Sequence, residues 1–448
     1  MNAMGVRWTA EQVLALAPDD ASRRAGSKLG TAGPWSDTGR GEGAVWGVCK
    51  GSGRVPYRTV VDTTGPAYLC ACSSRKFPCK HALGLLLLQA SEGTATEETT
   101  VPDWAGEWLA ARRGRAASAA RRTEGGAAGG PADPEAARRR AERRAARITS
   151  GAEELEQRLA DLLRGGLAAA EQPGYGLWEE TAARMIDAQA PGLAGRVREL
   201  GAIPGSGPGW PVRLLEECAL THLLDRAWLT ADRLPAPFAT TVRTRVGLTA
   251  PVDGVAVRDH WLVLAQYDAA DARLTTRRIW LYGTASGRTA LLLSFGAAGR
   301  APQLALPVGA VLDGELTPHA GSGRLRAEPG DAFVPVAGPV APPPGGPVGA
   351  ALDAYGRALG EDPWLNSWPV TLSGVVPARA EYGWQLADAD GREALPLTPA
   401  AQSRPGLWRL VALSGGAPVT VFGECGHQGF TPLAAWSPES PGETVPLI

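Results

Sequence analysis

The chain has 448 residues, and its 45 Lys and Arg residues against 46 Asp and Glu give a formal net charge of −1. A hydrophobic content of 44% excludes a disordered or fibrous chain and is enough for several domain cores. The near-zero charge excludes a uniformly basic nucleic-acid coat protein but allows a local basic patch. Six cysteines are too few for a disulfide scaffold and favour a reducing compartment.

The N-terminal residues lack the apolar core and cleavage site of a signal peptide. The longest apolar run, residues 82–88, is much shorter than a membrane-spanning helix. We therefore expect a cytoplasmic protein without a membrane partner.

Residues 1–90 predict a small mixed domain. Residues 9–28 are typical of a helix capped by Thr9 and interrupted or restarted at Pro18. Residues 79–90 predict a short buried helix. Three short runs separated by turn residues predict an antiparallel meander: residues 44–50, 56–62 and 67–72. The core of this domain is therefore expected within residues 44–90.

Residues 91–150 predict a linker that is first acidic and then rich in arginine, and that ends in a polar helix. Residues 111–150 contain 11 Arg and four acids, a net of +7, so the rest of the chain sums to −8. Only four of the 45 basic residues are Lys, and an arginine cluster in so biased a chain is weak evidence for phosphate binding. We interpret the segment as a solvated linker and exposed helix, or as a face that docks on an acidic partner, with phosphate binding as the alternative. Its arginines are Arg112, Arg113, Arg115, Arg121, Arg122 and those from Arg138 to Arg147.

The remaining chain predicts an α-helical part followed by a β-rich half. Periodic apolar stretches in residues 151–232 predict a helical bundle ending near Leu229. From about Phe238 the pattern favours strands, which predicts a β-rich domain over residues 233–335. A Pro-rich linker at 336–350 and a β-rich C-terminal domain at 351–448 complete the chain, and residues 407–413 are among its expected strands. The predicted fold class is α+β and multidomain.

Cys70, Cys72, Cys79 and His81 form the pattern C-x-C-x6-C-x-H, the one strong chemical signal in the sequence. Zn²⁺ prefers thiolate and imidazole ligands in a tetrahedron, and a helix N-terminus favours the thiolate form of a cysteine. Four protein ligands fill the coordination sphere, so the predicted zinc is structural rather than catalytic. Four unliganded buried groups are the alternative. It is disfavoured because four of the chain's eleven Cys and His residues fall within twelve positions.

The other Cys and His residues do not predict a second site. Cys49 is interpreted as a small core residue. Cys425 with His427 and Cys218 with His222 offer two ligands each, too few for a structural zinc. The sequence also contains no phosphate-binding P-loop, nucleophile elbow or zinc-protease motif. We therefore expect no enzyme activity and no small-molecule substrate.

Residues 45–88 resemble a SWIM zinc finger, a family defined by C-x-C-x(n)-C-x-H on a ββα unit. The resemblance covers about a tenth of the chain and implies that Cys70, Cys72, Cys79 and His81 bind one Zn²⁺. SWIM domains are regarded as binding modules for DNA or protein. The layout of the chain is also similar to stand-alone bacterial SWIM proteins, which are often encoded beside MoxR-type AAA+ ATPases and von Willebrand A-domain proteins. This similarity implies a protein partner of that system.

The loop between the ligands offers a contact surface. Arg75, Lys76 and Phe77 lie in the loop, and Lys80 lies between two ligands. Such cations can contact phosphates, and the aromatic ring can stack on a base. Alternatively, the cations balance the negative charge of three thiolates around Zn²⁺. The sequence thus predicts a non-enzymatic binding or adaptor protein whose finger contacts nucleic acid (DNA) or protein. The alternative is a scaffold for an AAA+ ATPase and von Willebrand A-domain system that binds no nucleic acid.

Overall fold

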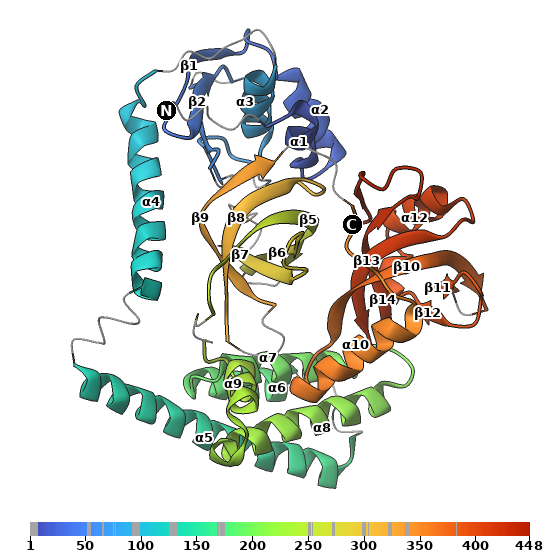
Figure 1. The fold of residues 1–448 in the computed structure, drawn as a ribbon. Helices are drawn as coiled ribbons and strands as arrows, with labels where there is room; N and C mark the ends of the chain where they lie inside the picture. The colour runs from blue at the N-terminus through green and yellow to red at the C-terminus, as the bar shows by residue number, and fades with distance from the viewer. Residues whose placement is uncertain are drawn as a thin grey trace.

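The computed structural model of the chain (Figure 1) describes residues 8–51, 55–64, 67–74, 76, 78–91, 99–124, 133–167, 170, 175–249, 252, 254–270, 274–297, 302, 304–320, 325–336, 341–381 and 383–448. It describes the backbone alone for residues 115–124, 134, 175, 177, 270 and 331. Within these residues, helices are combined with three antiparallel sheets, which confirms the predicted α+β multidomain class. None of the described helices has both the length and the apolar character needed to cross a bilayer.

The N-terminal unit is an antiparallel sheet accompanied by three helices. Thr9 caps the first helix by accepting a hydrogen bond from the Gln12 backbone N–H, as the sequence predicts. The sheet has a further edge strand, WSDTGRG, which the sequence does not predict because it lacks alternating apolar residues. The elements are α1 (Ala10–Ala15), α2 (Asp20–Lys28), β1 (Trp35–Gly41), β2 (Ala44–Cys49), β3 (Tyr57–Asp62), β4 (Ala67–Cys70) and α3 (Lys80–Ala90), and the strand order is β1-β2-β3-β4.

Both faces of this sheet are covered. Val45 and Val61 pack in the core that contains the buried side chains of α3, whereas Trp46 and Val60 pack against α4 (Asp103–Glu124) on the other face. Alternation along β2 and β3 produces the two apolar faces, because successive strand residues point to opposite sides. Part of the segment predicted as a linker is therefore packed against the N-terminal sheet, while residues 92–98 and 125–132 of that segment lie outside the described residues.

The helical bundle lies at the opposite end of the molecule from the N-terminal unit (Figure 1). Its core is formed by residues such as Ile148, Leu155, Leu193 and Leu224. The first helix of the bundle begins well before residue 150, so the predicted polar helix and the predicted bundle share one continuous helix. The elements are α5 (Pro134–Gly165), α6 (Tyr175–Asp187), α7 (Pro191–Ala202), α8 (Trp210–Leu229), η2 (Ala231–Arg233) and α9 (Ala236–Arg245).

Helix α9 corrects the expectation that strands begin near Phe238. Its sequence, APFATTVRTR, has several β-branched residues and little amphipathic character, which favours a strand on sequence grounds alone. In the structure a proline in its first turn suits the helix N-terminus, and Thr241 and Val242 are buried against the bundle. Tertiary packing thus decides this segment, and the first strand of the β-rich half begins at Val257.

The β-rich half contains two antiparallel sheets. The five-stranded sheet has the order β7-β6-β5-β8-β9 and is made of β5 (Val257–Ala270), β6 (Leu274–Gly283), β7 (Thr289–Ala297), β8 (Val311–Pro318) and β9 (Ala327–Val336). It curves back on itself, since the Leu291 N–H on edge strand β7 donates to the Leu325 carbonyl beside β9, at 2.7 Å. The second sheet has the order β12-β11-β10-β13-β14-β15.

The elements of the C-terminal unit are α10 (Val348–Glu361), β10 (Ser367–Ala380), β11 (Gly383–Asp388), β12 (Ala394–Pro396), α11 (Pro399–Gln402), α12 (Gly406–Ser414), β13 (Val419–Gly426), β14 (Gly429–Trp436) and β15 (Val445–Pro446). Helix α12 corrects the strand predicted for residues 407–413. Leu407, Leu410 and Ser414 are buried at helical spacing, and Gly415 ends the helix in the left-handed conformation at φ 53°. The short apolar run does not reveal this helical period because Trp408, on its exposed side, is also apolar.

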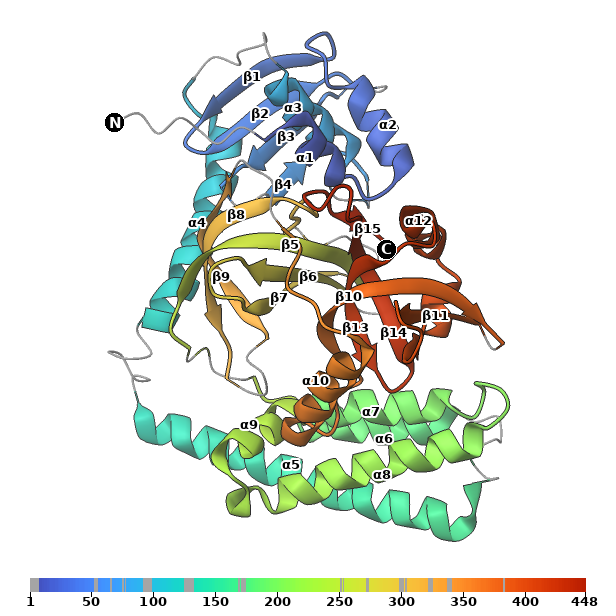
Figure 2. The ribbon, with the colours of Figure 1, turned by 45° about the vertical axis from the view of Figure 1, so that its right-hand side comes forward.

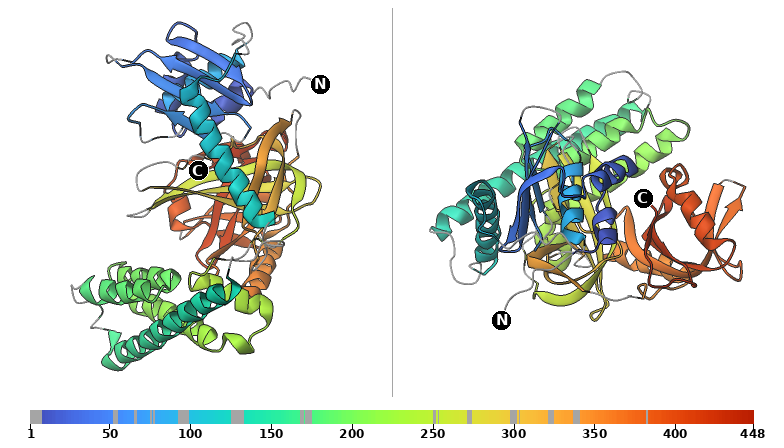
Figure 3. Two further views of the ribbon diagram at one scale, coloured as in Figure 1. Left: turned by 90° about the vertical axis from the view of Figure 1, so that its left-hand side faces the viewer. Right: turned by 90° about the horizontal axis from the view of Figure 1, so that it is seen from above.

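The N-terminal unit and the C-terminal unit both pack against the five-stranded sheet, so linkers alone do not join these parts (Figures 2 and 3). One face of the five-stranded sheet, with Leu262 and Trp280, packs against Phe422 and Trp436 of the C-terminal sheet. The opposite face shares a core with the N-terminal unit, and the Phe333 N–H donates to the Thr64 carbonyl at 2.6 Å. The N-terminal unit is therefore built into the body of the protein.

Candidate metal centre

Three cysteines and one histidine meet where β4 ends and α3 begins. One ligand atom from each of Cys70, Cys72, Cys79 and His81 lies within 4.8 Å of all the others. Cys70 is the last residue of β4, Cys79 is the N-cap of α3, and His81 lies in the first turn of that helix. Cys70, Cys79 and His81 are buried, and Cys72 is half-buried. The four residues of the C-x-C-x6-C-x-H pattern thus converge on one point.

The spacing of these atoms suits a tetrahedral zinc ion. A Zn–S bond of about 2.3 Å and a Zn–N bond of about 2.0 Å place a sulfur and a nitrogen ligand about 3.5 Å apart. Cys70 Sγ lies 3.6 Å from His81 Nδ1. The donor set of three sulfurs and one imidazole nitrogen is also among those that structural zinc sites use. The residues are therefore close enough to hold a metal ion and are consistent with zinc.

The electrostatics of the cluster are compatible with a bound cation. Hydrogen bonding by Cys70 and then by Cys79 lowers the pKa of the Cys72 thiol, whereas hydrogen bonding by Cys70 and then by Cys72 raises the pKa of Cys79. Three sulfurs at this distance cannot all become thiolates, because each negative charge opposes the next. A divalent cation removes this conflict and takes the place of the thiol protons.

Two neighbours orient the ligands. The hydroxyl of Thr59 on β3 lies 3.2 Å from Cys70 Sγ, and it donates a hydrogen bond when that sulfur is a thiolate. The Tyr57 ring lies beside the His81 imidazole, with ring centroids 4.7 Å apart and planes tilted by 33°. Such contacts from surrounding residues fix ligand orientation and tune metal affinity. The sequence analysis did not identify either residue, because both lie on the paired strand β3.

The predicted contact residues of the loop have different environments. Arg75 and Phe77 lie outside the described residues. The Lys76 ammonium forms an ion pair with the Asp19 carboxylate at the start of α2, and this hydrogen bond is the main reason that the pKa of Asp19 is lowered to about 2. Lys80 is exposed on the first turn of α3. One of the predicted cations is thus engaged within the protein.

The remaining cysteines and histidines are not part of this cluster. Among the described residues, no second group of three or more metal-binding side chains has its ligand atoms within such a distance. Cys49 is buried at the end of β2, and burial, followed by the nearby Cys70, raises the pKa of its thiol. Cys218 and Cys425 are buried in separate cores, and the ring of His222 hydrogen-bonds to Glu156 at 2.7 Å.

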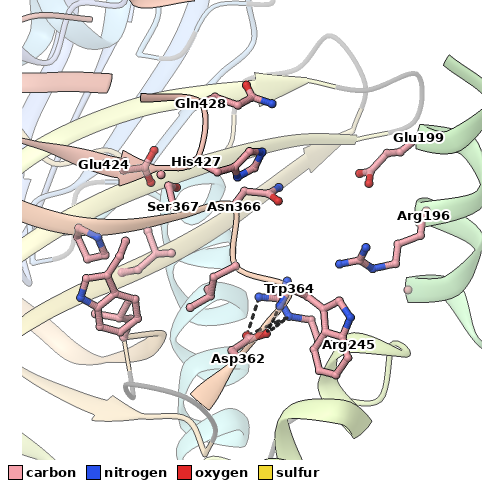
Figure 4. A pocket seen from close by; sticks show the side chains of 18 of the residues that line it. Arg196, Glu199, Arg245, Asp362, Trp364, Asn366, Ser367, Glu424, His427 and Gln428 are labelled. Atoms are coloured by element: carbon pink, nitrogen blue, oxygen red, sulfur yellow. Dashed lines mark hydrogen bonds and ion pairs between the residues drawn. The ribbon is translucent and has the colours of Figure 1, made fainter. Parts of the chain in front are cut away.

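A cleft of about 940 Å³ lies where the bundle meets the two sheets of the β-rich half. Figure 4 shows Arg196 of α7 opposite Asn366 and His427 of the C-terminal unit. Two ion pairs at the cleft join separate units: Arg245 to Asp362 at 2.6 Å, and Arg278 to Glu424 at 3.4 Å. The first pair joins the bundle to the C-terminal unit, and the second joins the five-stranded sheet to the C-terminal unit.

Comparison with known proteins identifies the bundle. Residues 143–246, about a quarter of the chain, match the family model of the SWIM-associated four-helix bundle domain. The match begins within α5 and ends just after α9. Neither the curated proteins nor the solved structures gave a match. A domain associated with SWIM fingers therefore follows, in this chain, a set of three cysteines and one histidine in SWIM order, and the match supports a protein of the SWIM type.

Proposed function

We propose that the protein is a non-enzymatic binding or adaptor protein whose SWIM finger is held together by one structural Zn²⁺. The observation that carries the proposal is the convergence of Cys70, Cys72, Cys79 and His81 within 4.8 Å. Four protein ligands leave no coordination position for a water or substrate, so the ion has a structural role. In this proposal, β3, β4 and α3 are the ββα unit of the finger.

The zinc ion connects the sheet to the helix. Its ligands lie at the end of β4, in the turn that follows, and in the first residues of α3. Metal binding therefore supplies free energy for docking the helix on the sheet, as it does in other small zinc domains. The first test is metal content: purified protein is expected to contain one zinc ion per chain by elemental analysis. Cys72→Ser should contain none. A wild-type protein without zinc, or a variant that keeps it, contradicts the assignment.

The favoured partner of the finger is nucleic acid. Lys80 is exposed beside the metal ligands, and Lys76 is exposed although it is paired with Asp19. Exposed cations beside the ligand cluster give contacts to phosphates that weaken as salt rises. Arg75 and Phe77, from the same loop, complete the proposed contact surface.

Fluorescence anisotropy with labelled DNA and RNA tests this role. Lys76→Ala/Lys80→Ala should weaken binding by about tenfold at low salt and reduce its salt dependence. Lys28→Ala, a substitution of an exposed lysine at the end of α2, serves as the control and should change nothing. Equal binding by the double variant and the wild-type protein contradicts a role for the finger.

A protein-interaction scaffold is the second candidate function. The ion pair between Lys76 and Asp19 favours it, because a lysine engaged within the protein contributes less to phosphate binding. The partner proposed by resemblance is a MoxR-type AAA+ ATPase or a von Willebrand A-domain protein. Sedimentation of the purified protein mixed with each of these proteins from the same genome tests the scaffold. Complex formation without any nucleic-acid binding supports it, and separate sedimentation contradicts it.

A further inference from the structure

The N-terminal half of α5 presents four arginines on one side. Arg140, Arg143, Arg144 and Arg147 are spaced three and four residues apart, which places them on one face of the helix. With Gln189 and Pro191, at the turn between α6 and α7, they line a concavity of about 670 Å³. We call these four residues the α5 arginine face. Arg140, Arg143 and Arg147 are exposed, and Arg144 is half-buried.

This face has no acidic counterpart in the described part of the chain. No described Asp or Glu carboxylate lies within 4.0 Å of the four guanidinium groups. By contrast, Arg138 on the same helix pairs with Glu142 at 3.2 Å, and Arg139 pairs with Glu135 at 3.0 Å. The arginines of α5 thus divide into paired ones and a group that faces the concavity without acids.

Arg144 is only weakly hydrogen-bonded within the protein. Its guanidinium donates to the Gly247 carbonyl after α9, at 3.4 Å, and its buried Nε has no hydrogen-bond partner among the described residues. Like charges three or four residues apart on a helix destabilise it. An arrangement of four such charges without acidic partners is stabilised by a ligand that brings negative charge and acceptor oxygens together.

We propose that the α5 arginine face binds the phosphodiester backbone of a nucleic acid. Arg140 and Arg147 are seven residues apart, and a rise of about 1.5 Å per residue puts them about 10 Å apart along the helix. Phosphates of one DNA strand repeat about every 3.4 Å along the duplex axis, so the face spans about three of them. Guanidinium groups bind phosphate oxygens in a bidentate manner, which suits arginine better than lysine for this contact. Contacts to phosphate oxygens carry no sequence information, so the proposed contact is independent of sequence.

This inference deepens the nucleic-acid form of the proposed function but uses a different surface from the finger. The finger and α5 lie at opposite ends of the molecule (Figure 1). The two surfaces can therefore be tested separately in the full-length protein, and the failure of one does not imply the failure of the other.

The test compares two double variants of α5 that change the charge equally. Arg143→Gln/Arg147→Gln removes two guanidiniums from the face, whereas Arg138→Gln/Arg139→Gln removes two paired ones from the same helix. Binding to a labelled DNA duplex is measured by anisotropy between about 50 and about 200 mM salt. We expect the face variant to lose about tenfold in affinity at low salt, and its slope of log K against log salt to fall by about two. The control variant should stay within about twofold of the wild-type protein.

Each other result overturns the inference. Equal losses in both α5 variants show that only overall charge matters. A loss restricted to Lys76→Ala/Lys80→Ala places the contact at the finger instead. If the wild-type protein does not bind DNA at low salt but binds labelled polyglutamate, the partner of the face is an acidic protein. Circular dichroism and thermal melting of every variant show whether a loss reflects an unfolded helix, and a third variant, Arg140→Gln, gives a milder perturbation of the same face.

Discussion

The guanidinium of Arg245 forms an ion pair with the carboxylate of Asp362, which lies 117 positions away in the sequence. The Arg245 Nε lies 3.1 and 3.0 Å from the two carboxylate oxygens, and a second guanidinium nitrogen lies 2.6 Å from one of them. Arg245 is the last residue of α9, and Asp362 follows α10, so the pair joins the SWIM-associated bundle to the C-terminal unit. Only 5% of the Asp362 side chain is exposed, and its carboxylate also accepts from the Trp364 N–H. The Trp364 indole N–H in turn donates to the Leu220 carbonyl of α8.

Arg245→Ala should therefore lower the free energy of unfolding by about 3 kcal/mol, because it removes the hydrogen-bonded cation of a buried ion pair. Chemical denaturation measures the change. Arg243→Ala, an exposed arginine of the same helix, is the matched control and should change stability by less than about 0.5 kcal/mol. Equal stability of the two variants contradicts the view that this pair holds the two units together.

The same pair shows what a sequence can and cannot predict. The candidate metal ligands were recognisable because Cys70, Cys72, Cys79 and His81 fall within twelve residues at a spacing typical of zinc sites. No local pattern marks Arg245 and Asp362 as partners, or Lys76 and Asp19, since each contact depends on how distant elements pack. The number of arginines in the sequence likewise revealed a basic segment. It did not distinguish the arginines that pair with acids from those of the α5 arginine face. The concavity that distinguishes the two groups is made with the distant turn between α6 and α7.

The prediction of secondary structure from the sequence was wrong for two segments, α9 and α12. The β-branched residues of α9 favour a strand, yet burial of Thr241 and Val242 against the bundle makes the segment helical. In α12 the exposed Trp408 hides the helical period of the buried residues. The helix α3 was predicted well because its apolar pattern is strong within its own segment.

Thr59→Val should weaken zinc binding without abolishing it. The Thr59 hydroxyl lies 3.2 Å from Cys70 Sγ, and loss of such a hydrogen bond to a ligand lowers metal affinity by about tenfold or more. Competition with a chromogenic chelator measures the affinity. Thr59→Ser keeps the hydroxyl and should bind nearly as tightly as the wild-type protein. If serine and valine weaken binding equally, the hydroxyl has no role in the site.

Removal of zinc should loosen the finger and leave the bundle intact. The finger and the five-stranded sheet share one core, whereas the bundle has a core of its own. We therefore expect a chelator, or Cys72→Ser, to raise hydrogen exchange in β4 and α3 first, and then in the strands packed against them. Exchange in α5, α7 and α8 should stay unchanged. Loss of protection throughout the bundle contradicts separate cores, and unchanged protection of α3 contradicts a structural role for the metal.

Asp225 should make the bundle less stable as pH rises. Its carboxyl on α8 is fully buried and has no hydrogen-bond partner among the described residues. Burial, followed by the negative charge of Glu156, raises its pKa from 3.8 to about 9, and the positive charge of Arg196 opposes this shift only in part. The folded protein thus keeps a proton that the unfolded chain releases near pH 4.

Because the folded state binds more protons between these two pKa values, the free energy of unfolding falls by about 1.4 kcal/mol per pH unit from this group alone. The stabilisation is complete below about pH 4 and is lost as pH approaches 9. Asp225→Asn stays neutral at every pH, so its stability should exceed that of the wild-type protein by a margin that grows from about pH 6 to about pH 8. Urea denaturation across that range measures the two slopes. Parallel slopes for the two proteins show that Asp225 does not keep its proton in the fold, since a neutral side chain and a titrating one cannot respond alike to pH.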